Sequence, residues 1–73
     1  MWTGKRFILR NKILAIRVVD KTRQAEYIPE GEVLEVIGGP RPNAIHLVDV
    51  HWNACEYKVF ASDVEEAAEE ITN

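Results

Sequence analysis

Residues 45–61, IHLVDVHWNACEYKVFA, constrain the fold more than any other stretch of this chain. Apolar and polar side chains alternate along residues 45–52 and again along residues 55–61, and a period of two predicts β-strands with one buried face. In the first run one face carries Val48, Val50 and Trp52, and the other carries Leu47, Asp49 and His51. In the second run one face carries Cys55, Tyr57 and Val59, and the other carries Glu56 and Lys58. Two residues separate the runs, which is the commonest hairpin spacing, so the sequence predicts two paired strands.

The turn of this predicted hairpin consists of Asn53 and Ala54. A two-residue hairpin turn usually needs positive φ at both positions, and Asn accepts that conformation readily. At Ala54 the Cβ would crowd the carbonyl at a cost of about 1 kcal/mol, and Gly is the residue expected there. The sequence therefore predicts either strain at Ala54 or a wider loop.

Two further strands are predicted from the same alternation. In residues 13–19 one face carries Leu14, Ile16 and Val18, and the other carries Ala15 and Arg17. In residues 32–37 one face carries Leu34 and Val36, and the other carries Val33, Glu35 and Ile37. Apolar residues on both faces of this second run indicate a strand that is central in the sheet or covered on both sides.

The segments that follow these two strands lack the alternation. Residues 20–29, DKTRQAEYIP, are polar and predict a ten-residue loop, from which Tyr27 and Ile28 fold back onto the sheet. Residues 38–43, GGPRPN, predict a surface loop, because two Gly and two Pro in six residues cannot continue a strand or a helix.

The two ends of the chain carry weaker signals. Residues 1–12 predict an N-terminal arm or short strand that packs by Trp2 and Phe7. Trp2 either covers an edge of the core or stacks on a base or a partner peptide. Near the other end, Ser62 followed by Glu65 is a capping box, which predicts a helix with Ser62 as its N-cap.

The predicted C-terminal helix is short. Its apolar stripe, with helical spacing, consists of Val64, Ala67, Ala68 and Ile71. Glu69 and Glu70 are unfavourable at a helix C-terminus because of the helix dipole, so we expect the helix to end by about Ala68. Residues 70–72 could then form a last short strand.

The order of these elements predicts an all-β fold. A chain of 73 residues makes one domain with a thin core, with residues 1–12 as the arm and residues 13–73 as the barrel and helix. Four to five short antiparallel strands separated by turn signals predict a small closed barrel or paired sheets, with a short C-terminal helix.

Part of the sequence resembles a known family. Over residues 29–67 the patterns PEGEVLEVIGG and VDVHWNACEYKVFASDVEE resemble small bacterial SH3-like barrel proteins of unknown function. They are similar also to the stromal SH3-like subunit of photosystem I, through the valine-rich strand and the Tyr, Phe-Ala and acidic positions that follow it. This resemblance implies an SH3-like barrel and carries no function, because the shared residues are turns, core positions and a cap. The chain departs from the pattern at Ala54, where such barrels often have Gly, and in its basic N-terminal extension.

Charge is divided unevenly along the chain. Residues 1–23 carry a net charge of +6 and residues 24–73 a net charge of −9. This asymmetry is either neutralised within the fold or marks an acidic or nucleic-acid partner for the basic part of the chain. In the second case the contacts would come from seven basic residues, with Trp2 or Tyr27 stacking on bases. The seven are Lys5, Arg6, Arg10, Lys12, Arg17, Lys21 and Arg23.

Reactive groups are sparse. His46, His51, Cys55 and Asp49 are ligand types that suit Zn²⁺, but the odd spacing of the two His places them on opposite faces of one strand. A base and thiol pair of His51 and Cys55 would need a cation or a helix N-terminus to hold the thiolate, and Asp49 and Glu56 oppose it. We therefore expect no catalytic residue, no metal and no cofactor, and an enzyme or a metal-binding protein is the least favoured alternative.

Binding of a protein partner is the function that the sequence favours. In SH3-like folds aromatic residues of the long loop and the central hairpin line a shallow groove. The candidates here are Tyr27, Trp52, Tyr57 and Phe60. The alternative is that each belongs to the core, and we expect Trp52 and Tyr57 to be at least half buried. Apolar runs too short for a membrane span or a signal peptide, with a single Cys, predict a cytoplasmic protein that does not enter a membrane. The pattern leaves open whether the chain is a monomer or a homodimer.

Overall fold

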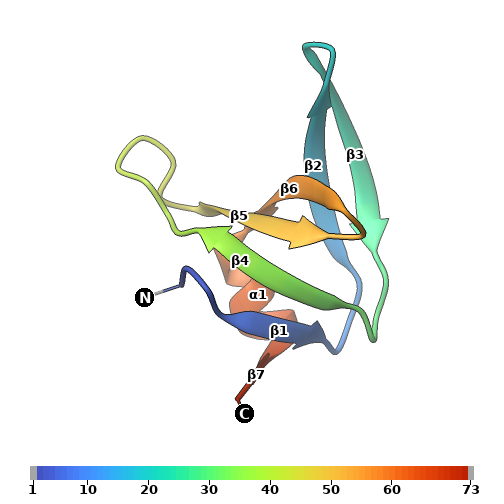
Figure 1. Ribbon diagram of the computed structural model, residues 1–73, viewed down its shortest axis with the longest axis vertical. Helices are drawn as coiled ribbons and strands as arrows, with labels where there is room; N and C mark the ends of the chain where they lie inside the picture. The colour runs from blue at the N-terminus through green and yellow to red at the C-terminus, as the bar shows by residue number, and fades with distance from the viewer. Residues whose placement is uncertain (1, 73) are drawn as a thin grey trace.

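The computed structural model describes residues 2–72, which form one antiparallel sheet and one short helix (Figure 1). The elements in chain order are β1 (Arg6–Leu9), β2 (Ile13–Val19), β3 (Thr22–Ile28), β4 (Val33–Gly38), β5 (Leu47–Trp52), β6 (Cys55–Phe60), α1 (Ala61–Ala67) and β7 (Ala68–Ile71). The spatial order of the strands is β3-β2-β6-β5-β4-β1-β7. The all-β class is confirmed, although the sheet has seven strands where the sequence predicts four to five.

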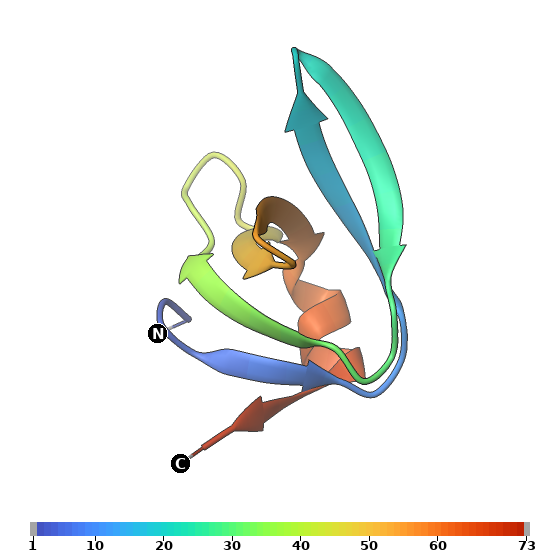
Figure 2. The same cartoon turned by 45° about the vertical axis from the view of Figure 1, so that its right-hand side comes forward.

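The sheet is strongly curved but not closed. Its two end strands, β3 and β7, do not pair with each other, so the closed barrel named among the expectations is not formed by the described residues. α1 lies inside the curve and contacts β1, β2, β6 and β7 (Figure 2). From the apolar stripe of this helix, the side chain of Val64 is buried in the core.

The core lies on the concave face of the sheet. Its buried residues are Leu9, Ile13, Ala15, Ile28, Leu34, Val36, Val48, Val50, Tyr57, Val59 and Val64. The face of β2 that enters the core is the one that carries Ala15 and not the more apolar face, because Ala15 pairs with the buried Val59 of β6. Ile13 and Ala15 are buried, whereas Val18 is 59% exposed. β4 is central in the sheet as predicted, but its outer face is uncovered at Val33 and Ile37.

The central hairpin is confirmed residue by residue. β5 pairs with β6 in the predicted register, from Leu47 opposite Phe60 to Trp52 opposite Cys55. The turn has two residues, with φ of 52° at Asn53 and 63° at Ala54. The left-handed conformation at Ala54 is therefore present, and the alternative of a wider loop is wrong.

The predicted ten-residue loop at 20–29 is wrong. Residues 22–28 form β3, which pairs with the whole of β2 through a two-residue turn at Asp20 and Lys21. Both turn residues have positive φ, 49° and 65°. Ile28 folds into the core as predicted, but Tyr27 stays 58% exposed.

The C-terminal helix begins two residues earlier than predicted. Phe60 occupies the N-cap with extended backbone and without a side-chain cap, so Ser62 lies inside the first turn and the predicted capping box is wrong. The N–H of Ala61 instead donates to the carbonyl of His46 at 2.8 Å. The helix ends at Ala67, and the short last strand that we expect at 70–72 is present as β7.

Residues 2–12 contain a short strand, β1, which was one of the two expectations. β1 lies between β4 and β7, and Trp2 packs against the core with its ring 5.9 Å from that of Phe7. Two basic side chains of this segment reach acids of β7. Lys5 pairs with Glu70 at 3.3 Å and Arg10 pairs with Glu69 at 2.6 Å. Part of the charge asymmetry is thus neutralised within the fold.

Candidate functional site

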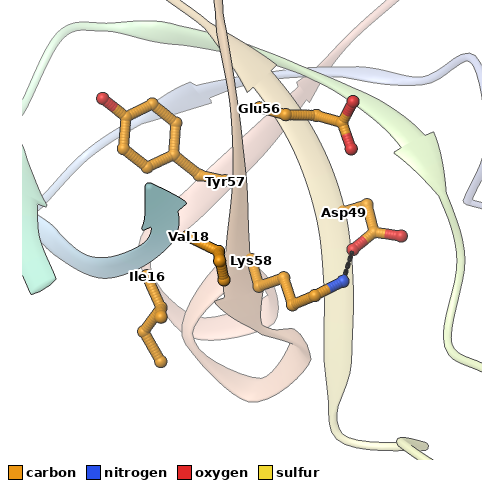
Figure 3. A pocket seen from close by; sticks show the side chains of 6 residues that line it. All are labelled: Ile16, Val18, Asp49, Glu56, Tyr57 and Lys58. Carbon is orange, nitrogen blue, oxygen red and sulfur yellow. Dashed lines mark hydrogen bonds and ion pairs between the residues drawn. The ribbon is translucent and has the colours of Figure 1, made fainter. Parts of the chain in front are cut away.

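An ion triad on the convex face, which we call the outer face, is the most organised polar feature of the structure. Asp49 of β5 is the one charged residue that is buried among the described residues, at 7% exposure. Its Oδ1 accepts from Lys58 Nζ at 2.6 Å, and its Oδ2 lies 2.7 Å from Arg41 Nη1. Lys58 is directly opposite Asp49 in the hairpin register, and its side chain reaches across to the carboxylate (Figure 3). Arg41 comes from the loop between β4 and β5.

The environment of Asp49 fixes its charge. Burial would by itself raise the pKa of this carboxyl, but the hydrogen bond from Lys58 and the charges of Lys58 and Arg41 outweigh burial. The pKa of Asp49 therefore lies below its ordinary value. A carboxylate that is ionised and already bound to two cations is a poor proton donor or acceptor near neutral pH. The triad is suited to fastening the 39–46 loop to the hairpin.

A small notch lies beside the triad, where β2 separates from β6. Only Ala15 and Ile16 of β2 pair with β6, and beyond them β2 diverges. The notch has a volume of about 140 Å³ and is lined by Ile16, Val18, Asp49, Glu56, Tyr57 and Lys58 (Figure 3). Its mixture of two aliphatic side chains with two carboxylates and an amine suits one side chain of a bound protein better than a small-molecule substrate.

Residues 17–24, beyond this point of divergence, form a projecting hairpin (Figures 1 and 2). The alternation of the strands places Leu14, Ile16 and Val18 on the outer face of β2. The residues opposite them in the register are Tyr27, Ala25 and Arg23 of β3. The outer face of the β2–β3 pair is therefore mainly apolar, and Val18 and Tyr27 are each more than half exposed.

The four aromatic residues predicted to bind are not gathered in one groove. Tyr57 is buried on the concave face, where its ring lies 5.7 Å from Trp52. Trp52 donates from Nε1 to Glu32 at 2.8 Å, and the hydroxyl of Tyr57 donates to Glu26 at 3.1 Å. Burial and the hydrogen bond to Glu26 both raise the pKa of Tyr57.

The other two aromatic candidates lie apart from this pair. Phe60 is at the far end of the hairpin from Trp52 and stacks on His46, with the two ring centroids 6.2 Å apart. Tyr27 lies on the outer face, with Lys12 Nζ 4.7 Å from its ring centre. Next to Tyr27 is a shallow hollow of about 460 Å³, lined also by Asn11, Lys12, Pro29 and Glu30.

Six of the seven basic candidates divide between two ends of the molecule. Lys5, Arg6 and Arg10 lie on or beside β1, where Lys5 and Arg10 are paired with acids. Arg17, Lys21 and Arg23 lie on the projecting hairpin, and none of them takes part in an ion pair among residues 2–72. Figure 1 places the turn of this hairpin at the top and β1 at the bottom. Lys12 lies between the two groups, over Tyr27.

The His and Cys candidates are separated as well. His51 is opposite Glu56 on the outer face, whereas the partly buried Cys55 is opposite Trp52 and packs against the core. His46 precedes β5. Within residues 2–72, no three His, Cys, Asp or Glu side chains gather in a way that could hold a metal ion.

The triad itself was missed by reasoning from the sequence. In the sequence, Asp49 and Lys58 each look like an ordinary polar residue on the exposed face of an alternating strand. The signal that would have found the pair is the hairpin register, since a two-residue turn at 53–54 places Asp49 directly opposite Lys58. Arg41 left no comparable signal, because it reaches Asp49 from a loop.

Comparison with known proteins adds no constraint, since no protein family, curated protein or solved structure matches the chain. The one helix described in residues 2–72, α1, is far shorter than a membrane-spanning segment.

Proposed function

We propose that the chain is a non-catalytic interaction module of SH3-like architecture that binds a protein partner in the cytoplasm. The observation that carries the proposal is the uncovered apolar outer face of β2 and β3, centred on Ile16, Val18 and Tyr27. Apolar surface that is contiguous and rimmed by charged residues is typical of protein interfaces. Lys12, Arg23, Glu56 and Lys58 supply such a rim here.

Two features of the fold support this proposal. The long β2–β3 hairpin, the tight hairpin and the short helix before the last strand follow in the order of an SH3-like barrel. The notch at one end of the apolar face and the hollow at the other can each receive a side chain of an extended segment. The single Cys55, free in the structure, agrees with a reducing compartment.

The test is an affinity experiment with three forms of the full chain. Wild type, Val18→Asp and Ile45→Asp are immobilised, and the proteins that each retains from a lysate are compared. Ile45 is a matched control because it is 71% exposed but lies in the loop before β5. We expect a protein that wild type and Ile45→Asp retain and Val18→Asp loses. A wild-type chain that retains only nucleic acid contradicts the proposal, and so does equal loss in both variants.

Nucleic-acid binding is a second candidate, supported by the cations of the projecting hairpin, which form no ion pair within residues 2–72. Residues 17–24 carry a net charge of +2 from Arg17, Lys21 and Arg23 against Asp20, although the chain as a whole carries −3. A two-stranded ribbon of this kind fits the major groove of a duplex. Fluorescence anisotropy with single-stranded and duplex oligonucleotides at low salt tests it. Binding that falls steeply with salt and is lost in Lys21→Glu/Arg23→Glu supports this candidate, and flat titrations remove it.

A further inference from the structure

The two free edges of the sheet are unequally protected. β7 has four residues, and its Glu69 and Glu70 are held in ion pairs with Arg10 and Lys5. β3 has seven residues in unbroken register with β2, with no bulge, Pro or Lys, and its charged residues are Arg23 and Glu26, neither of which is in an ion pair among residues 2–72. Six of its seven residues are exposed, and no element lies along its outer side in Figures 1 and 2. Such an edge is a template for pairing with another strand.

The geometry of the β2–β3 hairpin decides which backbone groups face outward. In a two-residue hairpin the residues that flank the turn form a hydrogen-bonded pair, and hydrogen-bonded pairs alternate with non-bonded pairs along the ladder. Val19 and Thr22 flank the turn, so Thr22, Gln24, Glu26 and Ile28 direct their N–H and C=O groups toward β2. The residues whose N–H and C=O groups point to the free edge are Arg23, Ala25 and Tyr27.

We propose that β3 pairs antiparallel with β3 of a second copy of the chain, about a two-fold axis at Ala25. In this register Ala25 bonds Ala25 of the other copy, and Arg23 and Tyr27 of each copy bond one another across the interface. All three outward-facing residues are then used, which gives six backbone hydrogen bonds. The inference does not rest on the proposed function, because its backbone hydrogen bonds use the edge of β3, although the side chains of Arg23 and Tyr27 also lie on the outer face.

Other symmetric registers are less favourable. A two-fold axis perpendicular to the sheet pairs residues of equal parity, so the neighbouring choices are axes at Gln24 and at Glu26. An axis at Glu26 places two Glu side chains opposite each other and brings Pro29, which has no N–H, into the ladder. An axis at Gln24 requires Lys21, a turn residue with φ of 65°, to act as a strand residue. The Ala25 register has neither fault.

Side chains also favour the Ala25 register. It places Gln24 opposite Glu26 of the other copy on one face, where an amide can donate to a carboxylate. On the other face it places Arg23 opposite Tyr27, a pair suited to a cation–π contact. An unrelated extended segment would match this pattern only by chance, whereas a second copy supplies it twice by symmetry.

The test is sedimentation equilibrium of the full chain over roughly 5 to 500 µM, where a small interface of this kind dissociates. We expect the mass to rise with concentration from 8.4 kDa toward twice that value. Ala25→Pro removes one outward N–H without breaking a bond to β2, and Pro is tolerated on such an edge, so this variant should stay monomeric throughout. Ala25→Ser keeps the N–H and is the matched control, which should behave as wild type.

Two substitutions of opposite charge at position 24 test the register even if the Ala25→Pro variant folds poorly. Gln24→Lys should lower the protein concentration at which half of the chains are dimeric about fivefold, because the introduced ammonium group attracts Glu26 of the other copy. Gln24→Glu should raise this concentration by a similar factor. Within one chain residue 24 faces Arg17, so the same changes affect monomer stability in the opposite direction. Hydrogen exchange should show amides of Arg23, Ala25 and Tyr27 becoming protected as concentration rises. A wild-type chain that is monomeric throughout, or a dimer without this protection, overturns the proposal.

Discussion

Gly38 lies so close to Asp49 that a Cβ at position 38 would meet Oδ2 of the carboxylate at 2.9 Å and Nη2 of Arg41 at 3.2 Å. The register of β4 against β5 shifts between Val36 and Gly38, so this glycine is directly opposite Asp49. The absence of a side chain at Gly38 leaves room for the Arg41 guanidinium to bind the buried carboxylate. The Gly38–Gly39 pair of the sequence thus has one member with a packing role in the ion triad.

We predict that Gly38→Ala destabilises the protein by about 1–3 kcal/mol, because either the triad or the end of β4 must shift to admit the methyl group. Urea denaturation at neutral pH measures the change. Gly39→Ala is the matched control, since its Cβ would meet Trp2 at an ordinary 3.6 Å and should change stability by less than about 1 kcal/mol. Equal effects at the two positions would show that the triad does not depend on Gly38.

Asp49→Asn is expected to lower stability by about 2 kcal/mol at neutral pH, since it removes the charge that binds Lys58 and Arg41. The pKa of Asp49 is depressed in the folded state, so its contribution is present above the unfolded pKa, near 4, and is lost as pH falls through the folded value. The difference in unfolding free energy between wild type and Asp49→Asn should therefore be largest at neutral pH and should disappear in stronger acid.

Urea midpoints at a series of pH values from neutral downward measure this gap. Glu56→Gln, an exposed neutralisation beside the same notch, controls for the loss of one negative charge. A gap that stays constant with pH would mean that the lost stability comes from packing and not from ionisation of Asp49.

The strands that alternation reveals are those that bury one face. The β5–β6 hairpin is predictable because core valines recur every second residue and a two-residue spacing fixes the register, and β2 is predictable because apolar residues alternate along it. The same reasoning does not predict β3, because both of its faces are exposed up to Ile28 and its apolar and polar residues do not alternate. Its turn is equally hidden, because Asp20 and Lys21 take positive φ without the Gly or Asn that marks such turns.

The candidate site depends on relations that a single strand does not display. Which face of β2 is buried is decided by its pairing with Val59, and the alternation by itself favours the wrong face. The grouping of Arg17, Lys21 and Arg23 depends on β3 folding back on β2, a pairing that periodicity does not indicate. The expected burial of Tyr57 is confirmed, because its strand position points inward, but periodicity does not indicate that Tyr27 and Phe60 lie apart from it.

Tyr57→Phe should reduce the loss of stability in alkali. Burial and the bond to Glu26 raise the pKa of Tyr57 in the folded state, so folding favours the neutral phenol. This contribution is complete below the ordinary Tyr value, near 10, and is lost as pH rises from there through the folded value. Unfolding free energies at neutral and alkaline pH should converge for wild type and variant as pH rises.

At neutral pH the same variant should cost about 1 kcal/mol for the lost hydrogen bond. Tyr27→Phe is the control, because Tyr27 is exposed and its contact with Lys12 uses the ring, which Phe retains. A Tyr57→Phe protein whose stability differs from wild type by the same amount at every pH would contradict the role assigned to ionisation.

Ala54→Gly is predicted to stabilise the protein. Ala54 holds φ at 63°, a conformation that costs a residue with a Cβ about 1 kcal/mol, and the strand pairing on either side holds it there. Gly removes that strain but adds freedom to the unfolded chain, so the expected net gain is about 0.5 kcal/mol.

The reciprocal change, Gly31→Ala, places a methyl group in open space at φ of 90° and should cost about 1 kcal/mol or more through backbone strain alone. Ala44→Gly, at a loop position without positive φ, should destabilise and serves as the matched control. Denaturant midpoints for the three variants measure these changes, and an Ala54→Gly protein that loses stability as Ala44→Gly does would show that the turn at Asn53 and Ala54 carries no strain.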